Sequence, residues 1–209
     1  MEALDSPFQP DDIDIQSRTT SHSGFLRIDT LRLRHRLFDG GWSDNMQREL
    51  LVRPPAVGVL LFDPVRDEIV LVRQFRIGVL DEDNDKWLLE LVAGMVDPGE
   101  APLEVARREA QEEADCSPAD LVAIGEYYNS PGISSEKISL FCGRVDARSL
   151  GGVHGLAAEH EDIEVVVLSA ETVYEAVRTG RINNAMTIIA VQWLQLHKAT
   201  LLAGWSSPA

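Results

Sequence analysis

The 209 residues carry 19 lysines and arginines against 34 aspartates and glutamates, which gives a formal net charge of −15. This charge repels a nucleic-acid backbone and disfavours DNA or RNA as a partner, whereas local arginines or divalent cations can still favour a small phosphorylated ligand. Hydrophobic residues make up 44% of the chain, enough for a globular core, and no apolar run reaches the roughly 18 residues that span a bilayer.

The N-terminal segment is acidic and polar, without the apolar stretch of a secretory signal. The composition of its first 20 or so residues predicts a mobile tail or a loosely tied leader. The two cysteines, Cys116 and Cys142, lack metal-ligand spacing, so we expect no disulfide framework and a cytoplasmic protein.

The following segment predicts a small antiparallel sheet. Apolar residues and a histidine alternate with arginines over residues 31–37, which is typical of a half-buried strand, and "FDGG" supplies a turn before "QRELLVRP". Pro54 and Pro55 then interrupt the pattern. We expect residues 1–54 to form the tail and the small sheet, and residues 55–209 to form a second domain.

The second domain shows mixed strands with few helices. Its strand-like segments are residues 56–63, 68–77, 87–94, 121–130, 138–145 and 163–169. Its helical segments are residues 102–114, 170–180 with Ser169 as the cap, and 183–204. In the first of these helices Leu103, Ala106 and Ala110 are expected to face the core. The pattern predicts an α+β fold, a sandwich with a mixed sheet between helices.

The first helix, "PLEVARREAQEEA", carries a row of carboxylates. Glu109 and Glu113 lie four residues apart and Glu112 lies three after Glu109, so their side chains project to neighbouring positions. Like charges at this spacing destabilise a helix, and a bound divalent cation would remove the repulsion. On residue types alone, a solvated helix face with ion pairs to Arg107 and Arg108 is the alternative.

The stretch from Gly94 to Cys116 resembles the signature of the Nudix hydrolases, in which a glycine, a glutamate and an Arg-Glu…Glu-Glu helix follow one another at fixed spacing. The matching residues are Gly94, Glu100, Arg108, Glu109, Ala110, Glu112, Glu113 and Cys116. Asp115 stands where the family has glycine, at a helix C-cap whose left-handed conformation favours glycine but tolerates aspartate.

The resemblance implies a Nudix α/β/α sandwich that cleaves a diphosphate joined to another group. Glu109 and Glu113 would be the principal Mg²⁺ ligands, with Glu112 close by as a metal-binding or catalytic carboxylate. The backbone carbonyl of Ala93 would be a further ligand. Two or three Mg²⁺ ions, with Mn²⁺ as a substitute, would neutralise the diphosphate and activate water. The residues that would brace the loop rather than touch substrate are Gly94, Glu100 and Arg108.

Beyond the signature, the chain is similar to bacterial ADP-ribose pyrophosphatases, through segments such as "WLLELVAGM", "SPGISSE" and "INNAMTIIAVQWLQLH". In that branch of the family the general base lies on an acidic loop, which "LAAEHED" matches. Glu159 is therefore the first candidate for the base, and Glu161 is the second or a further metal ligand. A glycine-flanked loop can swing a carboxylate onto substrate, but on residue types alone this is a solvated acidic loop.

The same resemblance offers four candidates for substrate contacts. Arg76 and Arg48 would hold phosphate and adenosine. Glu136 would contact the terminal ribose or a phosphate-bound water, and Phe25 would stack on adenine. The alternatives are a surface ion pair for Arg48, a loop carboxylate for Glu136 and a core position for Phe25.

The predicted activity is Mg²⁺-dependent hydrolysis of ADP-ribose to AMP and ribose 5-phosphate. One alternative is a hydrolase of GDP-mannose or another nucleoside-diphosphate sugar, because the signature selects the diphosphate and not the groups it joins. Another is a non-catalytic Nudix-fold nucleotide sensor, although such modules usually lose signature glutamates that are present here. The resemblance also implies a homodimer formed through the N-terminal sheet.

Overall fold

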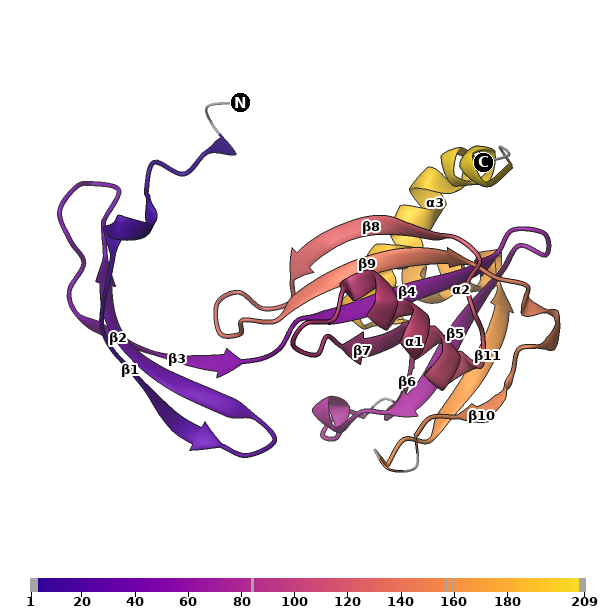
Figure 1. The fold of residues 1–209 in the computed structure, drawn as a ribbon, viewed down its shortest axis with the longest axis horizontal. Helices are drawn as coiled ribbons and strands as arrows, with labels where there is room; N and C mark the ends of the chain where they lie inside the picture. Colours follow the sequence, from indigo (N-terminus) through magenta and orange to yellow (C-terminus); the bar gives the residue numbers. More distant parts are fainter. Residues whose placement is uncertain (1–3, 84, 157, 159, 207–209) are drawn as a thin grey trace. The chain divides into compact units, whose positions relative to one another are not determined.

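The structure is a computed structural model that describes residues 4–83, 85–156, 158 and 160–206 (Figure 1). The chain divides into two compact units. The first comprises Met1–Pro54 with Tyr128–Glu136, and the second comprises Pro55–Tyr127 with Lys137–Ala209. No helix in the described part of the chain is both long and apolar enough to cross a membrane.

The first unit contains a three-stranded antiparallel sheet in the order β1-β2-β3. Its strands are β1 (Ile13–Ser23), β2 (Arg27–His35) and β3 (Met46–Val52). The short 3₁₀ turn η2 (Pro10–Asp12) precedes β1. The expectation of a mobile tail over the first 20 residues was therefore wrong for residues 13–20. These polar residues are ordered because they pair with β2 along its length.

A fully buried carboxylate, Asp29, lies within this sheet. It accepts hydrogen bonds from Arg18 Nε at 2.6 Å, Arg27 Nε at 2.9 Å and Thr20 Oγ1 at 2.9 Å. The hydrogen bonds from Arg27 and Arg18 hold the pKa of Asp29 well below its usual range. Side-chain hydrogen bonds and charge thus bind β1 to β2 where there is little apolar burial.

The second unit is built on a mixed sheet in the order β10-β11-β5-β4-β9-β8, with β6 paired to β5 and β7 paired to β4. The strands are β4 (Ala56–Asp63), β5 (Glu68–Phe75), β6 (Trp87–Glu90), β7 (Val92–Met95), β8 (Leu121–Tyr128), β9 (Lys137–Arg144), β10 (Gly152–His154) and β11 (Ile163–Ser169). Strands β4 and β9 are parallel, while β4 and β5 are antiparallel. The helices are α1 (Pro102–Ala114), α2 (Ala170–Arg178) and α3 (Ala185–Ser206), with 3₁₀ turns η3 (Ile77–Val79) and η4 (Ala147–Ser149).

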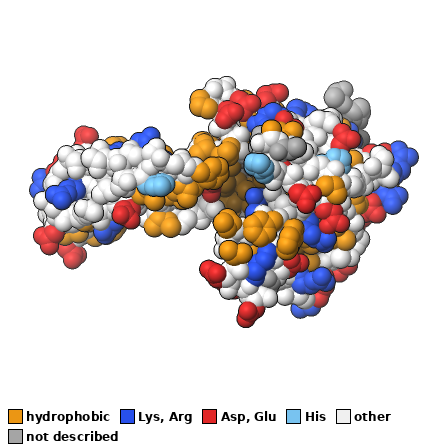
Figure 2. Space-filling model, turned by 90° about the horizontal axis from the view of Figure 1, so that it is seen from below, with side chains coloured by type: hydrophobic (Ala, Val, Ile, Leu, Met, Phe, Trp, Pro, Cys, Tyr) orange, Lys and Arg blue, Asp and Glu red, His pale blue; other side chains and the backbone are white. Residues whose placement is uncertain are grey.

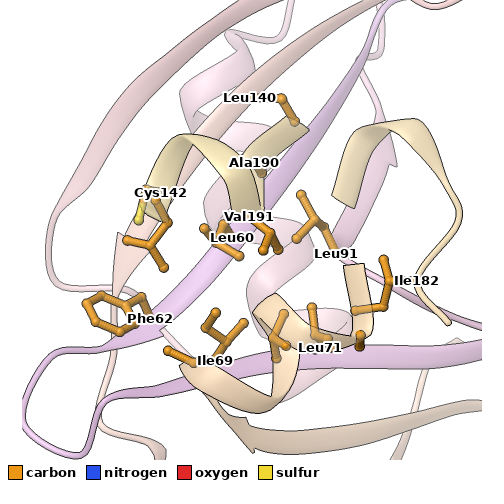
Figure 3. Packing of buried hydrophobic residues seen from close by; sticks show 14 of the residues in the cluster. Leu60, Phe62, Ile69, Leu71, Leu91, Leu140, Cys142, Ile182, Ala190 and Val191 are labelled. Carbon is orange, nitrogen blue, oxygen red and sulfur yellow. The ribbon is translucent and has the colours of Figure 1, made fainter. Parts of the chain in front are cut away.

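Helices cover both faces of this sheet. Leu60 and Phe62 of β4 pack in one core cluster with α2 and α3, and Figure 3 shows Leu60 close to Val191 of α3. Val59 and Leu61, which alternate with them, pack in a second cluster with α1. Burial on both faces explains the continuous apolar run of β4. The predicted α+β sandwich with a mixed sheet is confirmed.

The strand expected over residues 87–94 is in fact two strands. β6 pairs with β5 and β7 pairs with β4, and the chain changes partner at Leu91. Leu91 is buried, and its backbone N–H donates to Thr187 Oγ1 at 3.1 Å. The hydroxyl of Thr187 in α3 therefore accepts the hydrogen bond that a neighbouring strand would otherwise accept. Strand β7, which contains Ala93 and Gly94, follows this break directly.

Candidate active site

Helix α1 buries a stripe that contains two carboxylates. It begins at Pro102 and ends with Asp115 in the left-handed conformation, at φ 45°. The apolar members of the stripe are Val105, Ala106, Ala110 and Ala114, whereas Leu103, expected in the core, is exposed. Glu109 and Glu113 occupy the same stripe and are only 8% and 2% exposed. The solvated-face alternative is therefore wrong for these two glutamates.

Both buried carboxylates lie against strand β7. Glu113 Oε2 accepts a hydrogen bond from the backbone N–H of Ala93 at 2.9 Å. The Glu109 carboxylate packs on Gly94 so closely that a Cβ at residue 94 would overlap it. The glycine that opens the signature is therefore required by close approach of a side chain. Ala93 contacts Glu113 through its N–H, and the ligand role of its carbonyl stays a prediction.

Arg108 links three of the signature carboxylates. Its Nη1 lies 2.8 Å from Glu109 Oε1 and 3.0 Å from Glu112 Oε2, and its Nη2 lies 3.4 Å from Glu100 Oε2. Glu100 also accepts a hydrogen bond from the N–H of Asp97 at 3.2 Å, within the loop before α1. This arrangement fits the bracing role predicted for Glu100 and Arg108.

Burial dominates the electrostatics of the cluster. It raises the pKa of Glu109 to about 7, although Arg108 opposes the shift, and it raises the pKa of Glu113 to about 8, against the hydrogen bond from Ala93. The charge of Glu161 raises both pKa values further. Carboxylates far apart in the sequence therefore share one electrostatic neighbourhood.

Glu161 belongs to the loop that follows β10. Its Oε2 accepts a hydrogen bond from the N–H of Leu156 at 3.1 Å. Gly155, at φ 98°, packs against Glu161, and a Cβ there would come within 2.7 Å of the Glu161 Cβ. Glu161 is therefore held against Gly155 and Leu156. The other candidate for the base, Glu159, lies outside the described residues.

Arg76 lies in the same electrostatic neighbourhood, and it pairs with Glu90, a residue that the sequence did not single out. Arg76 Nε lies 2.6 Å from Glu90 Oε2, and the charge of Arg76 counteracts the burial that raises the pKa of Glu113. The available signal was one acidic residue in the otherwise apolar "WLLELVAG". Such a residue is more often a satisfied polar group than a functional one, so the pattern alone did not select it.

The remaining three candidates lie in the first unit. Phe25 is 89% exposed at the turn between β1 and β2, so the alternative of a core position was wrong. Arg48 is exposed on β3, and its Nη1 donates to the carbonyl of Gln47 at 3.0 Å. Glu136 accepts a hydrogen bond from Asn129 Nδ2 at 3.0 Å and lies 3.4 Å from Arg53 Nε.

The donor chemistry of the α1 cluster fits a hard divalent cation. Carboxylate oxygens are the ligands that Mg²⁺ prefers, and Glu109 and Glu113 are buried with more negative than positive charge around them. Among the described residues no three His, Cys, Asp or Glu side chains already surround one cation position. In the structure Arg108 supplies positive charge to this cluster by pairing with Glu109 and Glu112.

Comparison with known proteins agrees with this geometry. The family model described as NUDIX domain matches residues 52–208. The chain belongs to the NUDIX family. The ADP-ribose pyrophosphatase of Escherichia coli (strain K12) is 46% identical over 199 residues, which is 95% of each chain. The GDP-mannose pyrophosphatase of Cronobacter sakazakii is 36% identical over 152 residues, 72% of this chain and 78% of that protein.

A solved structure supports the NUDIX fold independently. The crystal structure of an ADP compounds hydrolase matches with a TM-score of 0.69 and 20% identity, over 97% of this chain and 99% of that one. At this identity the likeness concerns the fold alone. Helix α1, with its two buried carboxylates, lies within the residues that the family model matches.

Proposed function

We propose that this NUDIX protein is a Mg²⁺-dependent hydrolase that converts ADP-ribose to AMP and ribose 5-phosphate. The observation that carries the proposal is the placement of Glu109 and Glu113, two buried carboxylates held against Ala93 and Gly94 of β7. A protein that only needed a stable helix would gain from apolar residues at these positions. Their retention fits a site that binds cations.

Glu109, Glu113 and Glu112, with the Ala93 carbonyl, would hold two or three Mg²⁺ ions, and Mn²⁺ would substitute. Bound Mg²⁺ supplies charge neutralisation of the diphosphate and a water of lowered pKa. The guanidinium of Arg76 binds a phosphate oxyanion. Glu159 removes a proton from the attacking water, with Glu161 as the second candidate or a further cation ligand.

We favour ADP-ribose over GDP-mannose as the substrate because of the length of chain that each relative matches. The relative called ADP-ribose pyrophosphatase matches 95% of this chain, and the relative called GDP-mannose pyrophosphatase matches 72% at lower identity. The longer match must include most of the first unit, which carries Phe25, Arg48 and Glu136. We propose that these residues contact the adenosine and the terminal ribose.

We also propose a cytoplasmic homodimer formed through the sheet of the first unit. Apolar side chains that are exposed there include Ile13, Ile15 and Phe38, and Figure 2 shows hydrophobic side chains at the surface of the protein. A three-stranded sheet with so little apolar burial gains stability when a partner covers it. Size-exclusion chromatography with light scattering tests this, and a monomer at micromolar concentration would contradict it.

Phosphate-monoester formation tests the activity. ADP-ribose, GDP-mannose and NADH are incubated separately with Mg²⁺, and a phosphatase reports the products for the wild type, Glu113→Gln and the control Glu104→Gln. Glu104 is exposed on the same helix and outside the buried stripe. We expect rapid AMP formation from ADP-ribose in the wild type and the control, and its loss in Glu113→Gln. Tight nucleotide binding without turnover would instead indicate a nucleotide sensor.

A further inference from the structure

The Arg76–Glu90 pair lies where β5 and β6 meet, on the face of the sheet that α1 covers. Glu90 pairs in register with Val72, whose side chain belongs to the α1 core cluster. Residues directly opposite in an antiparallel pair share a face, and so do residues two apart on one strand. Val72, Gln74 and Arg76 therefore point to the side that carries Glu109 and Glu113.

The backbone holds both residues firmly. The N–H of Arg76 donates to the carbonyl of Lys86 at 2.9 Å, which extends the β5–β6 pairing to Arg76. On either side of Glu90, the carbonyl of Leu89 accepts from Asn184 Nδ2 at 2.8 Å, and the N–H of Leu91 donates to Thr187 Oγ1. The backbone on both sides of Glu90 is therefore fixed by hydrogen bonds with Asn184 and Thr187, at the start of α3.

The side chains make a specific contact. Glu90 Oε2 accepts from Arg76 Nε at 2.6 Å, and the side chain of Glu90 is only 15% exposed. In the described part of the chain, neither Nη1 nor Nη2 of Arg76 donates a hydrogen bond. The contact therefore fixes the guanidinium through Nε and leaves its two-pronged edge available, the edge that binds phosphate oxygens in pairs.

A neighbouring pair on β5 shows the contrast. Arg73 Nη1 contacts Glu164 on β11, whose side chain is 52% exposed. Here the carboxylate uses a terminal nitrogen, and solvent screens the pair, so it contributes little. Arg73–Glu164 therefore has the same residue types without the burial or the Nε contact, and it provides a matched control.

We infer that Glu90 is a positioning residue, which holds Arg76 through Nε so that both terminal nitrogens engage a phosphate oxyanion of the substrate. The inference rests on the proposed function, because the oxyanion belongs to the diphosphate of ADP-ribose. Glu90 itself carries a negative charge and repels that diphosphate. Removal of the charge alone would strengthen substrate binding, whereas loss of the positioning contact would weaken it.

Two substitutions separate charge from positioning. Glu90→Ala and Glu90→Gln both remove the charge, but only glutamine retains an oxygen that accepts from Arg76 Nε. For ADP-ribose with Mg²⁺ we expect Glu90→Ala to raise KM about tenfold, as loss of a charge-assisted hydrogen bond implies, with little change in kcat. We expect Glu90→Gln to restore most of the wild-type KM, and Glu164→Ala to leave it unchanged.

Binding without turnover provides a second readout. ADP-ribose affinity is measured by calorimetry in EDTA, for the wild type, Glu90→Ala, Arg76→Ala and the double variant. We expect Glu90→Ala to weaken ADP-ribose binding when residue 76 is arginine. The same change should have no further effect when residue 76 is alanine. If Glu90→Ala does not fold, Glu90→Met replaces it in this comparison, because methionine keeps most of the side-chain volume but has no oxygen that accepts from Arg76 Nε.

Three results would overturn the inference. The first is ADP-ribose binding by Glu90→Ala that equals or exceeds wild-type binding, and the second is an undiminished effect of Glu90→Ala in the Arg76→Ala background. The third is loss of Mg²⁺ binding by Glu90→Gln in the absence of nucleotide. The last would make Glu90 a cation ligand. Failure of the proposed function has a different signature, namely no AMP from ADP-ribose with the wild-type protein. The binding measurements in EDTA do not depend on that turnover.

Discussion

The carboxylate of Glu109 lies directly on the backbone of Gly94, in the space that a Cβ at residue 94 would occupy. Gly94 is not among the glycines with a positive φ, so conformational freedom is not the reason for glycine here. The requirement is steric. A side chain at residue 94 and the observed position of Glu109 exclude each other.

Gly94→Ala is accordingly expected to displace Glu109 and lower the rate of ADP-ribose hydrolysis by at least about tenfold, with an overpacking cost of about 1–3 kcal/mol. Gly204→Ala is the control, because a Cβ there meets no atom within 4 Å. Steady-state kinetics and thermal unfolding of both variants check the prediction. Wild-type activity in Gly94→Ala would show that Glu109 can function from another position.

The metal-free protein should lose stability as the pH rises. Burial raises the pKa of Glu113 from its ordinary value of 4.5 to about 8 in the folded protein, so between these pH values the folded state holds a proton that the unfolded chain releases. The contribution of Glu113 to stability is therefore greatest at low pH, and it falls as the pH rises from about 4.5 to about 8, through the two pKa values of this residue. Thermal unfolding in EDTA at several pH values measures this slope.

In the same measurement Glu113→Gln should flatten the slope and raise the melting temperature above pH 8, because it removes a buried charge. Addition of Mg²⁺ should stabilise the wild type and have less effect on the variant. Glu104→Gln, on the exposed side of α1, should follow the wild type. If the wild type and Glu113→Gln show identical slopes, Glu113 is not the group that titrates.

Asp29→Asn should loosen the sheet of the first unit, because it leaves Arg18 and Arg27 without their buried counter-charge. Amide hydrogen exchange along β1 and β2 is expected to accelerate. Asp14→Asn serves as the comparison, since the Asp14–Arg34 pair bridges the same strands near the surface. The prediction fails if both substitutions change exchange equally.

Thr187→Val should destabilise the second unit by about 1–3 kcal/mol, because the buried N–H of Leu91 would lose its acceptor. Valine has nearly the same shape as threonine, so the change removes a hydroxyl and little volume. Thr187→Ser keeps the hydroxyl and should retain the hydrogen bond. Denaturant unfolding measures the difference, and a loss of stability in Thr187→Ser without one in Thr187→Val would point to the methyl group instead.

Local signals made α1 predictable from the sequence. Pro102 at its first turn and Asp115 at its C-cap mark the ends that the structure has. Glu109 and Glu113 were harder, because a charge run usually indicates a solvated face and only the family resemblance favoured cations. Their burial depends on contact with β7, and the residue pattern of the helix alone does not predict that contact.

Other features depended on partners that are distant in sequence. The strand β1 is polar and carried no strand pattern, yet it pairs along β2. The break between β6 and β7 depends on a hydroxyl of α3, almost a hundred residues away along the chain. The importance of Glu90 follows from its hydrogen bond with Arg76, and the spacing of the two residues in the sequence does not predict that contact.

Ala106, Ala110 and Ala114 fill the contact between α1 and the sheet with methyl groups. Small side chains allow a helix to approach a sheet closely, and Glu109 and Glu113 stand on the same stripe. The size of these alanines consequently sets the height of the two carboxylates above β7. A bulkier residue at any of the three would move α1 away from the sheet and both glutamates with it. The packing of the core therefore also sets the distance between the two carboxylates and β7.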